Sequence, residues 1–342
     1  MRLPSACSGG CRGCCEVVEL GAPGHKLAGP ARKVVVLVEN MDYADLATEE
    51  TNPRSRGLDR MSTVQILEVM NEEDRRVPEV VARAIPEIAK AVDMIVARMA
   101  AGGRLLYVGA GTSGRLGILD AVECVPTFGV DPNQVSAVIA GGPGAVFHSV
   151  EAAEDDESSG VRDVAESITE LDVVVGISAS GVTPYVQGAL KAAKEVGAGT
   201  VAIVCNHADK LDLDVDVVIS LPVGAEVLTG STRLKAGTAQ KLVLNMISTA
   251  TMIKLGKVYD NLMVDMQATN RKLKRRAVRI VSIATGLDEE VSEDLLDKAG
   301  GNIKTAIVMA LASVNRREAE RALEKACGHT RNAVQAAIER TR

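Results

Sequence analysis

The sequence predicts an α/β protein: a three-layer sandwich with a five-stranded parallel sheet, followed by a small C-terminal three-helix domain. Two observations predict the sandwich. Short apolar runs alternate with longer segments of helical periodicity, as in parallel sheets that are covered on both faces. Glycine- and hydroxyl-rich turns follow two of these runs, which is typical of strands that lead into helices beside a ligand site. With 342 residues, the chain is long enough for both domains.

The elements before the sheet are predicted from capping residues and apolar periodicity. Residues 48–59 are polar and rich in turn formers, so they predict an arm or loop. Ser62 is a candidate N-cap for a first helix. After Pro78, a longer helical pattern with one apolar stripe continues to about Met99. Gly102 and Gly103 end this helix, and the first strand follows.

The sheet is predicted from five apolar runs. The strand candidates are residues 105–108, 135–140, 173–177, 200–204 and 217–221. Helical segments are expected after Ser113, around residues 148–154, and over residues 161–168, 183–196 and about 232–255. The alternation of strands and helices predicts parallel pairing.

The turn after the first strand predicts a phosphate site. It contains Gly109, Gly111 and Gly114, with Thr112 and Ser113 between the last two glycines. At a helix start, backbone N–H groups without intrahelical partners and the positive end of the helix dipole lie together and favour an anion. Thr112 and Ser113 would add hydroxyl donors.

The same Gly-x-Gly-x-x-Gly spacing also matches the dinucleotide-binding fingerprint. A nicotinamide site requires an acidic residue about 20 positions further on, at the end of the next strand. The next strand candidate ends instead in Gly141, Gly142 and Pro143. The dinucleotide interpretation therefore fails on its second half, and a purely structural turn is the other alternative.

A second polar loop follows the third strand. It contains Ser178, Ser180, Gly181 and Thr183, and Pro184 lies where a helix begins, a position at which its missing N–H is harmless. Parallel strands place their carboxyl ends at one edge of the sheet, which is where ligands of open α/β sheets bind. We therefore expect both loops to contact the same ligand.

A third polar segment, residues 224–238, precedes the long helix. Arg233 and Lys235 could simply face solvent there. Because Ser231 and Thr232 lie beside them at a helix start, they fit the edge of an anionic-ligand site better.

Glu123 and Glu154 are the candidate acid and base. Glu123 has apolar neighbours near a helix end, and burial there would raise its pKa. Glu154 opens a run of acidic residues. Either could be an ordinary exposed carboxylate, so spacing alone assigns neither. The sequence has no cluster with metal-ligand spacing and no Gly-x-Ser-x-Gly elbow, so a reaction without metal or cofactor is expected on a phosphorylated substrate.

Composition excludes several classes of partner. The net charge of −6 and the scarcity of aromatic residues, with four tyrosines, two phenylalanines and no tryptophan, argue against nucleic acid. No apolar run reaches the roughly 18 residues of a membrane span. Cys124, Cys205 and Cys327 are scattered singly, which is typical of reduced thiols in a cytoplasmic protein.

The two ends of the chain are expected to differ from its middle. Residues 1–40 contain four crowded cysteines and no sustained periodicity, and predict a disordered appendage or an extension absent from the mature chain. Residues 41–282 form the predicted catalytic domain. Residues 283–342 form the helical domain, with helices expected at 289–299, 303–314 and 317–327.

The loops at residues 109–115 and 178–185 resemble the sugar-phosphate-binding loops of the sugar isomerase (SIS) domain superfamily. Residues 224–241 are similar to the signature shared by N-acetylmuramic acid 6-phosphate etherases and glucokinase regulatory proteins. Segments 48–52, 71–74 and 261–265 extend the similarity to the etherases from Met41 to the C-terminus.

The resemblance implies an SIS-type sheet and a carbon–oxygen lyase of peptidoglycan amino-sugar catabolism. Such an enzyme cleaves the lactyl ether of N-acetylmuramic acid 6-phosphate by elimination and then water addition, giving N-acetylglucosamine 6-phosphate and D-lactate. The resemblance implies that Glu123 is the proton donor and Glu154 the base, that no cofactor takes part, and that a homodimer completes its sites across the interface. The implied substrate-binding residues are Gly111, Thr112, Ser113, Arg115, Ser178, Ser180, Gly181, Thr183, Glu226, Ser231, Thr232, Arg233 and Lys235.

Two other functions share these features. A non-catalytic sugar-phosphate sensor of the glucokinase regulatory protein type has two tandem SIS domains, whereas one five-stranded unit is predicted here. An aldose–ketose isomerase begins with the same proton abstraction, so chemistry alone does not separate it from an etherase. The spread of matching segments favours the etherase.

Overall fold

The computed structural model describes residues 46–268 and 270–341, so the extension predicted for residues 1–40 lies outside the described residues. A five-stranded sheet lies at its centre, with strand order β2-β1-β3-β4-β5 and every neighbouring pair parallel. The strands are β1 (Leu105–Gly109), β2 (Val135–Ile139), β3 (Val173–Ser178), β4 (Gly199–Val204) and β5 (Val217–Ser220). The predicted parallel sheet is confirmed, with each strand end within one residue of its expected position.

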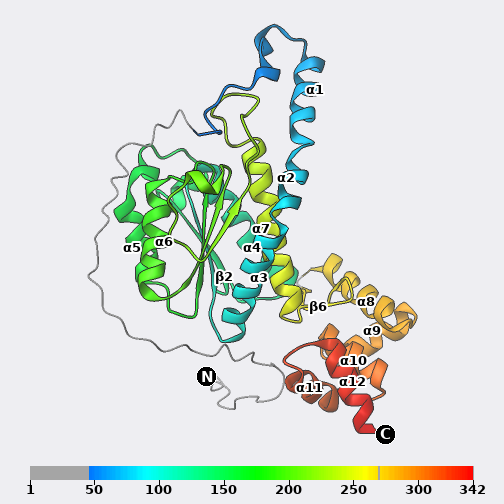
Figure 1. The fold of residues 1–342 in the computed structure, drawn as a ribbon. Helices are drawn as coiled ribbons and strands as arrows, with labels where there is room; N and C mark the ends of the chain where they lie inside the picture. The colour runs from blue at the N-terminus through cyan, green and yellow to red at the C-terminus, as the bar shows by residue number, and fades with distance from the viewer. Residues whose placement is uncertain (1–45, 269, 342) are drawn as a thin grey trace, which may run out of the picture.

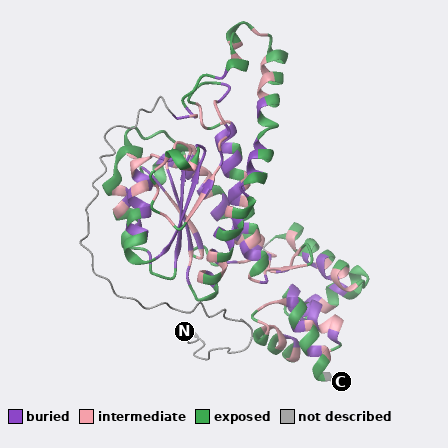
Figure 2. Ribbon diagram, in the orientation of Figure 1, coloured by how far each residue is buried: buried purple, intermediate pink, exposed green. Residues whose placement is uncertain are grey.

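Helices cover both faces of the sheet (Figure 1). One layer contains α3 (Ile85–Ala100), α4 (Gly111–Phe128) and α7 (Lys235–Lys254), and the other contains α5 (Glu157–Ala165) and α6 (Pro184–Val196). Tyr107 belongs to the core under the first layer and Val108 to the core under the second. Successive residues of one strand thus face opposite layers, and Figure 2 shows the strands buried throughout most of their length.

The N-terminal part forms an arm that projects from the sandwich (Figure 1). It comprises the short 3₁₀ turns η3 (Pro53–Ser55) and η4 (Leu58–Arg60) and then α1 (Thr63–Asp74); the next helix, α2 (Val77–Arg83), packs on α7 and buries its valines in the core. Ser62 caps α1 in a reciprocal capping box with Gln65. The single helix predicted from Pro78 to Met99 is wrong in one respect: the helix is interrupted at Ala84, between α2 and α3. Pro86 lacks the N–H that would continue the helix through this point.

The helix predicted around residues 148–154 is also wrong. This segment contains only the start of one 3₁₀ turn, η6 (Ala153–Asp155), and a second turn, η5 (Pro143–Val146), precedes it. Ala152 between them has a φ of 58°, which a right-handed helix does not accommodate. Asp156 accepts a hydrogen bond from the backbone N–H of Ser159, so the side chain caps α5 and starts that helix at Glu157, before the predicted position.

The C-terminal part begins with a two-stranded hairpin, β6 (Val258–Tyr259) and β7 (Leu262–Met263), and α8 (Arg271–Thr285). The three predicted helices are α9 (Glu289–Lys298), α10 (Ile303–Ala312) and α11 (Arg316–Lys325), and a fourth, α12 (Thr330–Thr341), was not predicted. Ala277 and Val281 of α8 share a core with α9 and α10. Residue 282, where the sequence places the domain boundary, therefore lies inside a helix that packs on the C-terminal bundle.

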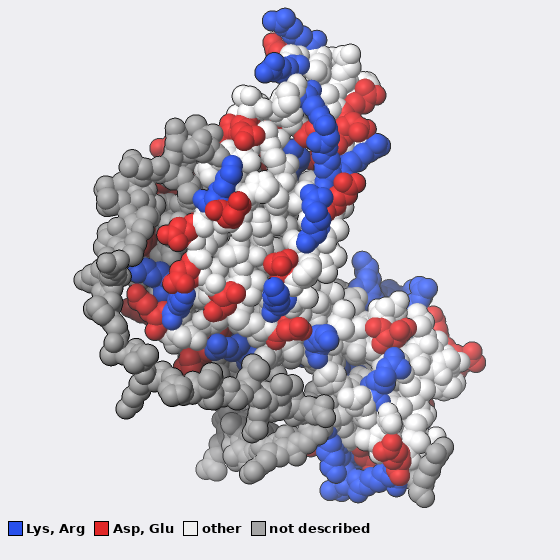
Figure 3. Space-filling view, in the orientation of Figure 1, with Lys and Arg blue, Asp and Glu red and all other residues white. Residues whose placement is uncertain are grey.

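Charged side chains of both signs are interspersed over the face shown in Figure 3. Within the described part of the chain, no helix is both long and apolar enough to cross a membrane.

Candidate functional site

The turn from β1 into α4 is built for close backbone approach. A Cβ atom on Gly109 would lie 2.7 Å from the backbone N of Gly114, and one on Gly114 would lie 2.7 Å from the Gly109 carbonyl oxygen. Gly111 has a φ of 52°, in the left-handed region that favours glycine. The glycines therefore let α4 start directly against the strand, with the first-turn N–H groups at the carboxyl edge of the sheet.

The loop after β3 holds its hydroxyl groups in a fixed cluster. Ser178 is buried, and its Oγ accepts a hydrogen bond from the backbone N of Gly181 at 2.9 Å. The same Oγ lies 2.8 Å from Thr183 Oγ1 and 3.3 Å from Ser180 Oγ. Ser180 and Thr183 are half-buried. The predicted hydroxyl-rich loop is thus preformed, with Ser178 shaping it and the other two hydroxyls nearer the surface.

The helices α4 and α7 meet at their N-termini. Ser113 on the first turn of α4 donates from its Oγ to Gln240 Oε1 of α7 at 2.9 Å, and both residues are buried. A Cβ atom on Gly237 would lie 3.4 Å from Thr112 Cγ2. These contacts bring Gly111, Thr112 and Ser113 beside the first turns of a second helix.

Arg115 and Glu154 line one cavity of about 170 Å³, together with Gly111. The Arg115 guanidinium donates to the carbonyl oxygens of Val146 at 2.9 Å and Ala145 at 2.7 Å. Arg115 thus fixes the loop that leads toward Glu154, whose own side chain is exposed. The direct substrate contact predicted for Arg115 stays a prediction.

The third polar segment is tied down by buried charges. Glu226 is fully buried and accepts hydrogen bonds from the backbone N–H groups of Lys235 at 3.0 Å and Ala236 at 2.9 Å, so it caps α7. Burial raises the pKa of Glu226 although both bonds favour its ionised form. Ser231 and Thr232 are half-buried nearby and Arg233 is exposed.

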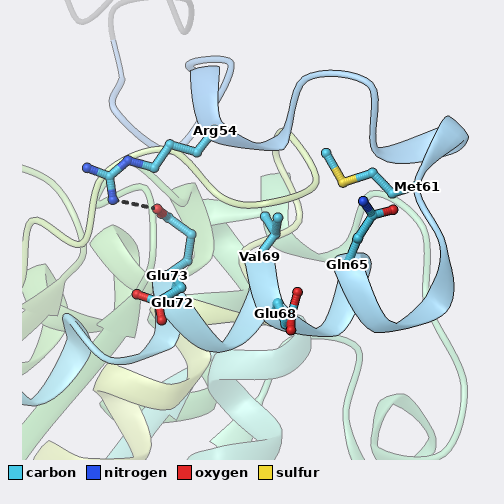
Figure 4. A pocket seen from close by; sticks show the side chains of 7 residues that line it. All are labelled: Arg54, Met61, Gln65, Glu68, Val69, Glu72 and Glu73. Carbon is cyan, nitrogen blue, oxygen red and sulfur yellow. Dashed lines mark hydrogen bonds and ion pairs between the residues drawn. The ribbon is translucent and has the colours of Figure 1, made fainter.

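The ammonium group of Lys235 is buried and lies 2.6 Å from Glu73 Oε2. Asn52 donates to the same carboxylate at 2.9 Å and to the carbonyl oxygen of Ala225 at 3.1 Å. Arg54 reaches Glu73 Oε1 at 3.3 Å, as Figure 4 shows. The N-terminal arm is thereby fastened to the segment before α7, and the substrate contacts predicted for Glu226 and Lys235 stay predictions.

Residues 87–194 match a family model described as the glucokinase regulatory protein N-terminal SIS domain, and residues 148–250 match the SIS domain. An N-acetylmuramic acid 6-phosphate etherase from Caldanaerobacter subterraneus subsp. tengcongensis is 55% identical over 295 residues, which cover 86% of this chain and 96% of that protein. Another protein of that name, from Serratia proteamaculans, is 53% identical over 295 residues, which cover 86% of this chain and 99% of that protein.

This chain belongs to the N-acetylmuramic acid 6-phosphate etherase family. Among solved structures, a phosphoheptose isomerase from Francisella tularensis is 18% identical, with a TM-score of 0.46 over 56% of this chain and 100% of that one.

In this etherase-family chain, Glu123 lies far from the other predicted site residues. It is exposed on α4, so its apolar sequence neighbours do not bury it in the single chain. It lines a separate cavity of about 540 Å³ with Val122, Pro126 and residues of β2. Gly111 and Glu123 are 12 residues apart in one helix, or about 18 Å at ~1.5 Å per residue. One chain therefore does not bring Glu123 to the cavity of Glu154.

Sequence reasoning did not assign roles to Gln240, Asn52 or Glu73. All three fall in segments that resemble the etherases, which is the signal that could have singled them out. Lys235, the buried cation that pairs with Glu73, is however 162 positions away in the sequence. Among the described residues, no group of three or more His, Cys, Asp or Glu side chains is placed to hold a metal ion.

Proposed function

We propose that this protein is an N-acetylmuramic acid 6-phosphate etherase, a lyase that releases D-lactate and leaves N-acetylglucosamine 6-phosphate. The observation that carries the proposal is the 55% identity to a protein of that name over 96% of its length. The match to the regulatory-protein model covers only residues 87–194, and so speaks for a shared domain rather than for a regulator.

The 6-phosphate is held at the carboxyl edge of the sheet. Backbone N–H groups of Gly111, Thr112 and Ser113 at the start of α4 and the hydroxyls of Ser180 and Thr183 form a neutral set of donors. Such contacts are the same in the ground state and the transition state, so they set KM rather than kcat.

The reaction proceeds on the open-chain aldehyde form of the sugar, in which the carbonyl group acidifies the C2 proton. Glu154 removes that proton as the C3–O bond to lactate breaks, and Glu123 protonates the departing lactate oxygen. The product of this step is a 2,3-unsaturated aldehyde. Water then adds its oxygen to C3 and a proton to C2, which yields N-acetylglucosamine 6-phosphate and restores both carboxyl groups.

A homodimer is part of the proposal, because Glu123 and Glu154 of one chain line different cavities. Leu119 and Val122, on the exposed side of α4 near Glu123, are 52% and 61% exposed. An apolar surface around a catalytic group supports burial there by a second subunit. The second chain would bring its Glu123 to the Glu154 site of the first.

A cytoplasmic location and a substrate derived from peptidoglycan recycling complete the proposal. Cys124 and Cys205 are buried free thiols, which supports a reducing compartment.

The test is release of D-lactate from N-acetylmuramic acid 6-phosphate by the purified protein, without added metal or nucleotide. Glu123→Gln and Glu154→Gln should each lower kcat by about 10²–10⁴-fold, the usual contribution of one acid or base. Glu166→Gln, an exposed carboxylate at the end of α5, is the matched control and should leave kcat unchanged. Binding of the sugar phosphate without any lactate release would instead identify a sensor.

A further inference from the structure

The Gln240 carboxamide behind Ser113 is only half satisfied. Its Oε1 accepts the bond from Ser113 Oγ at 2.9 Å, and the residue is 1% exposed. Within residues 46–268 and 270–341, its Nε2 has no oxygen or nitrogen acceptor, and the buried thiol of Cys205 offers it only a weak one. A buried N–H group without a good acceptor is costly, so this arrangement calls for an explanation.

The direction of the Ser113–Gln240 bond decides what Ser113 offers a ligand. When Ser113 donates to Gln240, its one proton is used, and its oxygen presents lone pairs that repel a phosphate oxygen. Turning the carboxamide by half a rotation exchanges Oε1 and Nε2. Nε2 then donates to Ser113 Oγ, and the Ser113 proton becomes free to point outward.

We infer that Gln240 is a positioning residue for the phosphate site: it donates from Nε2 to Ser113 Oγ when ligand is bound, so that Ser113 donates its proton to a phosphate oxygen. Ser113, at 8% exposure, reaches the edge of the site, whereas Gln240 is buried behind it. A phosphate offers only acceptors, so it takes the Ser113 proton, and Nε2 gains Ser113 Oγ as its acceptor. The inference rests on the proposed binding of the 6-phosphate by Ser113.

The test is a double-mutant cycle read out by binding of N-acetylglucosamine 6-phosphate in calorimetry. Ser113→Ala and Gln240→Met should each raise Kd about 10- to 100-fold, the range for a hydrogen bond to a charged group. The double variant should bind no more weakly than Ser113→Ala alone, because Gln240 acts through Ser113. Thr238→Ala is the control: this exposed hydroxyl bonds the Leu234 carbonyl of its own helix, and Kd should not change.

Steady-state kinetics separate positioning from a structural role. Gln240→Met should raise KM for the etherase substrate and leave kcat within about twofold. If Gln240→Met does not fold, Gln240→Asn replaces it, since its shorter amide does not reach Ser113.

Additive losses in the double variant, or an unchanged Kd in both Gln240 variants while Ser113→Ala weakens binding, would overturn the inference and leave the proposed function standing. An unchanged Kd in Ser113→Ala would overturn both the inference and the assignment of Ser113 to the phosphate.

Discussion

Glu73 ties the N-terminal arm to Lys235 at the start of α7. Burial by itself raises the pKa of Glu73, but hydrogen bonds from Lys235 and Asn52 and the charges of Lys235 and Arg54 outweigh burial and lower it overall. Since Lys235 is buried too, removing one partner leaves an uncompensated charge in the interior. The net attraction between Glu73 and Lys235 therefore matters less for stability than the cost of leaving one of the two charges buried without its partner.

Glu73→Gln should lower the free energy of unfolding at pH 7 by about 3–5 kcal/mol. The folded-state pKa of Glu73 lies below the ordinary value of 4.5, so its contribution is complete above pH 4.5 and is lost as the pH falls through the folded-state pKa. Urea unfolding of both proteins between pH 7 and pH 3 should show the difference shrinking in acid.

Glu72→Gln is the neighbouring control, because Glu72 forms an exposed ion pair with Arg75 at 2.9 Å. Its effect should stay within about 0.5 kcal/mol. A loss for Glu73→Gln that is the same at every pH would contradict the assigned titration.

Thr183→Val removes one hydroxyl from the Ser178 cluster and keeps the shape of the side chain. We expect KM to rise about 10- to 100-fold, the range for a hydrogen bond to a charged group, with kcat nearly unchanged. Initial-rate measurements of D-lactate release decide this. A fall in kcat at unchanged KM would place Thr183 at the reacting carbons instead.

At the level of elements, the junction of β1 and α4 sets the position of the phosphate site. The helix begins two residues after the strand ends, and this tight connection requires backbone atoms of Gly109 and Gly114 to touch. The end of β1 thus sets where α4 begins, and the start of α4 sets where the backbone N–H groups for the phosphate lie.

Gly109→Ala should destabilise the protein by about 1–3 kcal/mol, because the added Cβ would lie 2.7 Å from the Gly114 backbone N and force the helix away. The same substitution should also lower the affinity for N-acetylglucosamine 6-phosphate, because it shifts the start of α4. Thermal unfolding and calorimetry measure the two effects. Gly144→Ala, where a Cβ meets nothing within 4 Å, should leave stability almost unchanged; an equal loss there would argue against the steric explanation.

For the whole molecule, the separation of Glu123 from Glu154 is the decisive feature. The two carboxylates line different cavities of one chain, so the proposed mechanism, in which both act on one substrate, requires a second chain.

Mixing inactive Glu123→Gln and Glu154→Gln homodimers under subunit exchange should restore about a quarter of wild-type activity. Half of the dimers would then be hybrids, and each hybrid would contain one site with both carboxylates. Sedimentation should show dimers throughout. If both carboxylates of a site came from one chain, every mixed dimer would remain inactive, and a fully active monomer would exclude the shared site.

Local sequence determined the sheet and its loops. Runs such as residues 173–177 are short, apolar throughout and rich in β-branched residues, which is typical of a strand covered on both faces, and the glycines after residue 108 mark the turn. Pro86 and Asp156 also act locally, and the helix boundaries they set could have been taken from sequence. The fourth C-terminal helix was missed because its buried side chains, Ala333 and Ala337, are too small to give a strong apolar stripe.

Only the tertiary structure decided which polar groups meet. Sequence periodicity predicts that one face of a helix or strand is apolar, but it does not predict which distant residue contacts a given side chain. The sequence marks Lys235 and Arg115 as candidate ligand residues, but only the fold shows that Lys235 pairs with buried Glu73 and that Arg115 donates to the carbonyl groups of residues 145 and 146. Gln240 acquires a role solely through its contact with Ser113. Hydrophobic patterning is encoded over a few residues, whereas the pairing of charges and hydrogen bonds depends on contacts that the completed fold brings together.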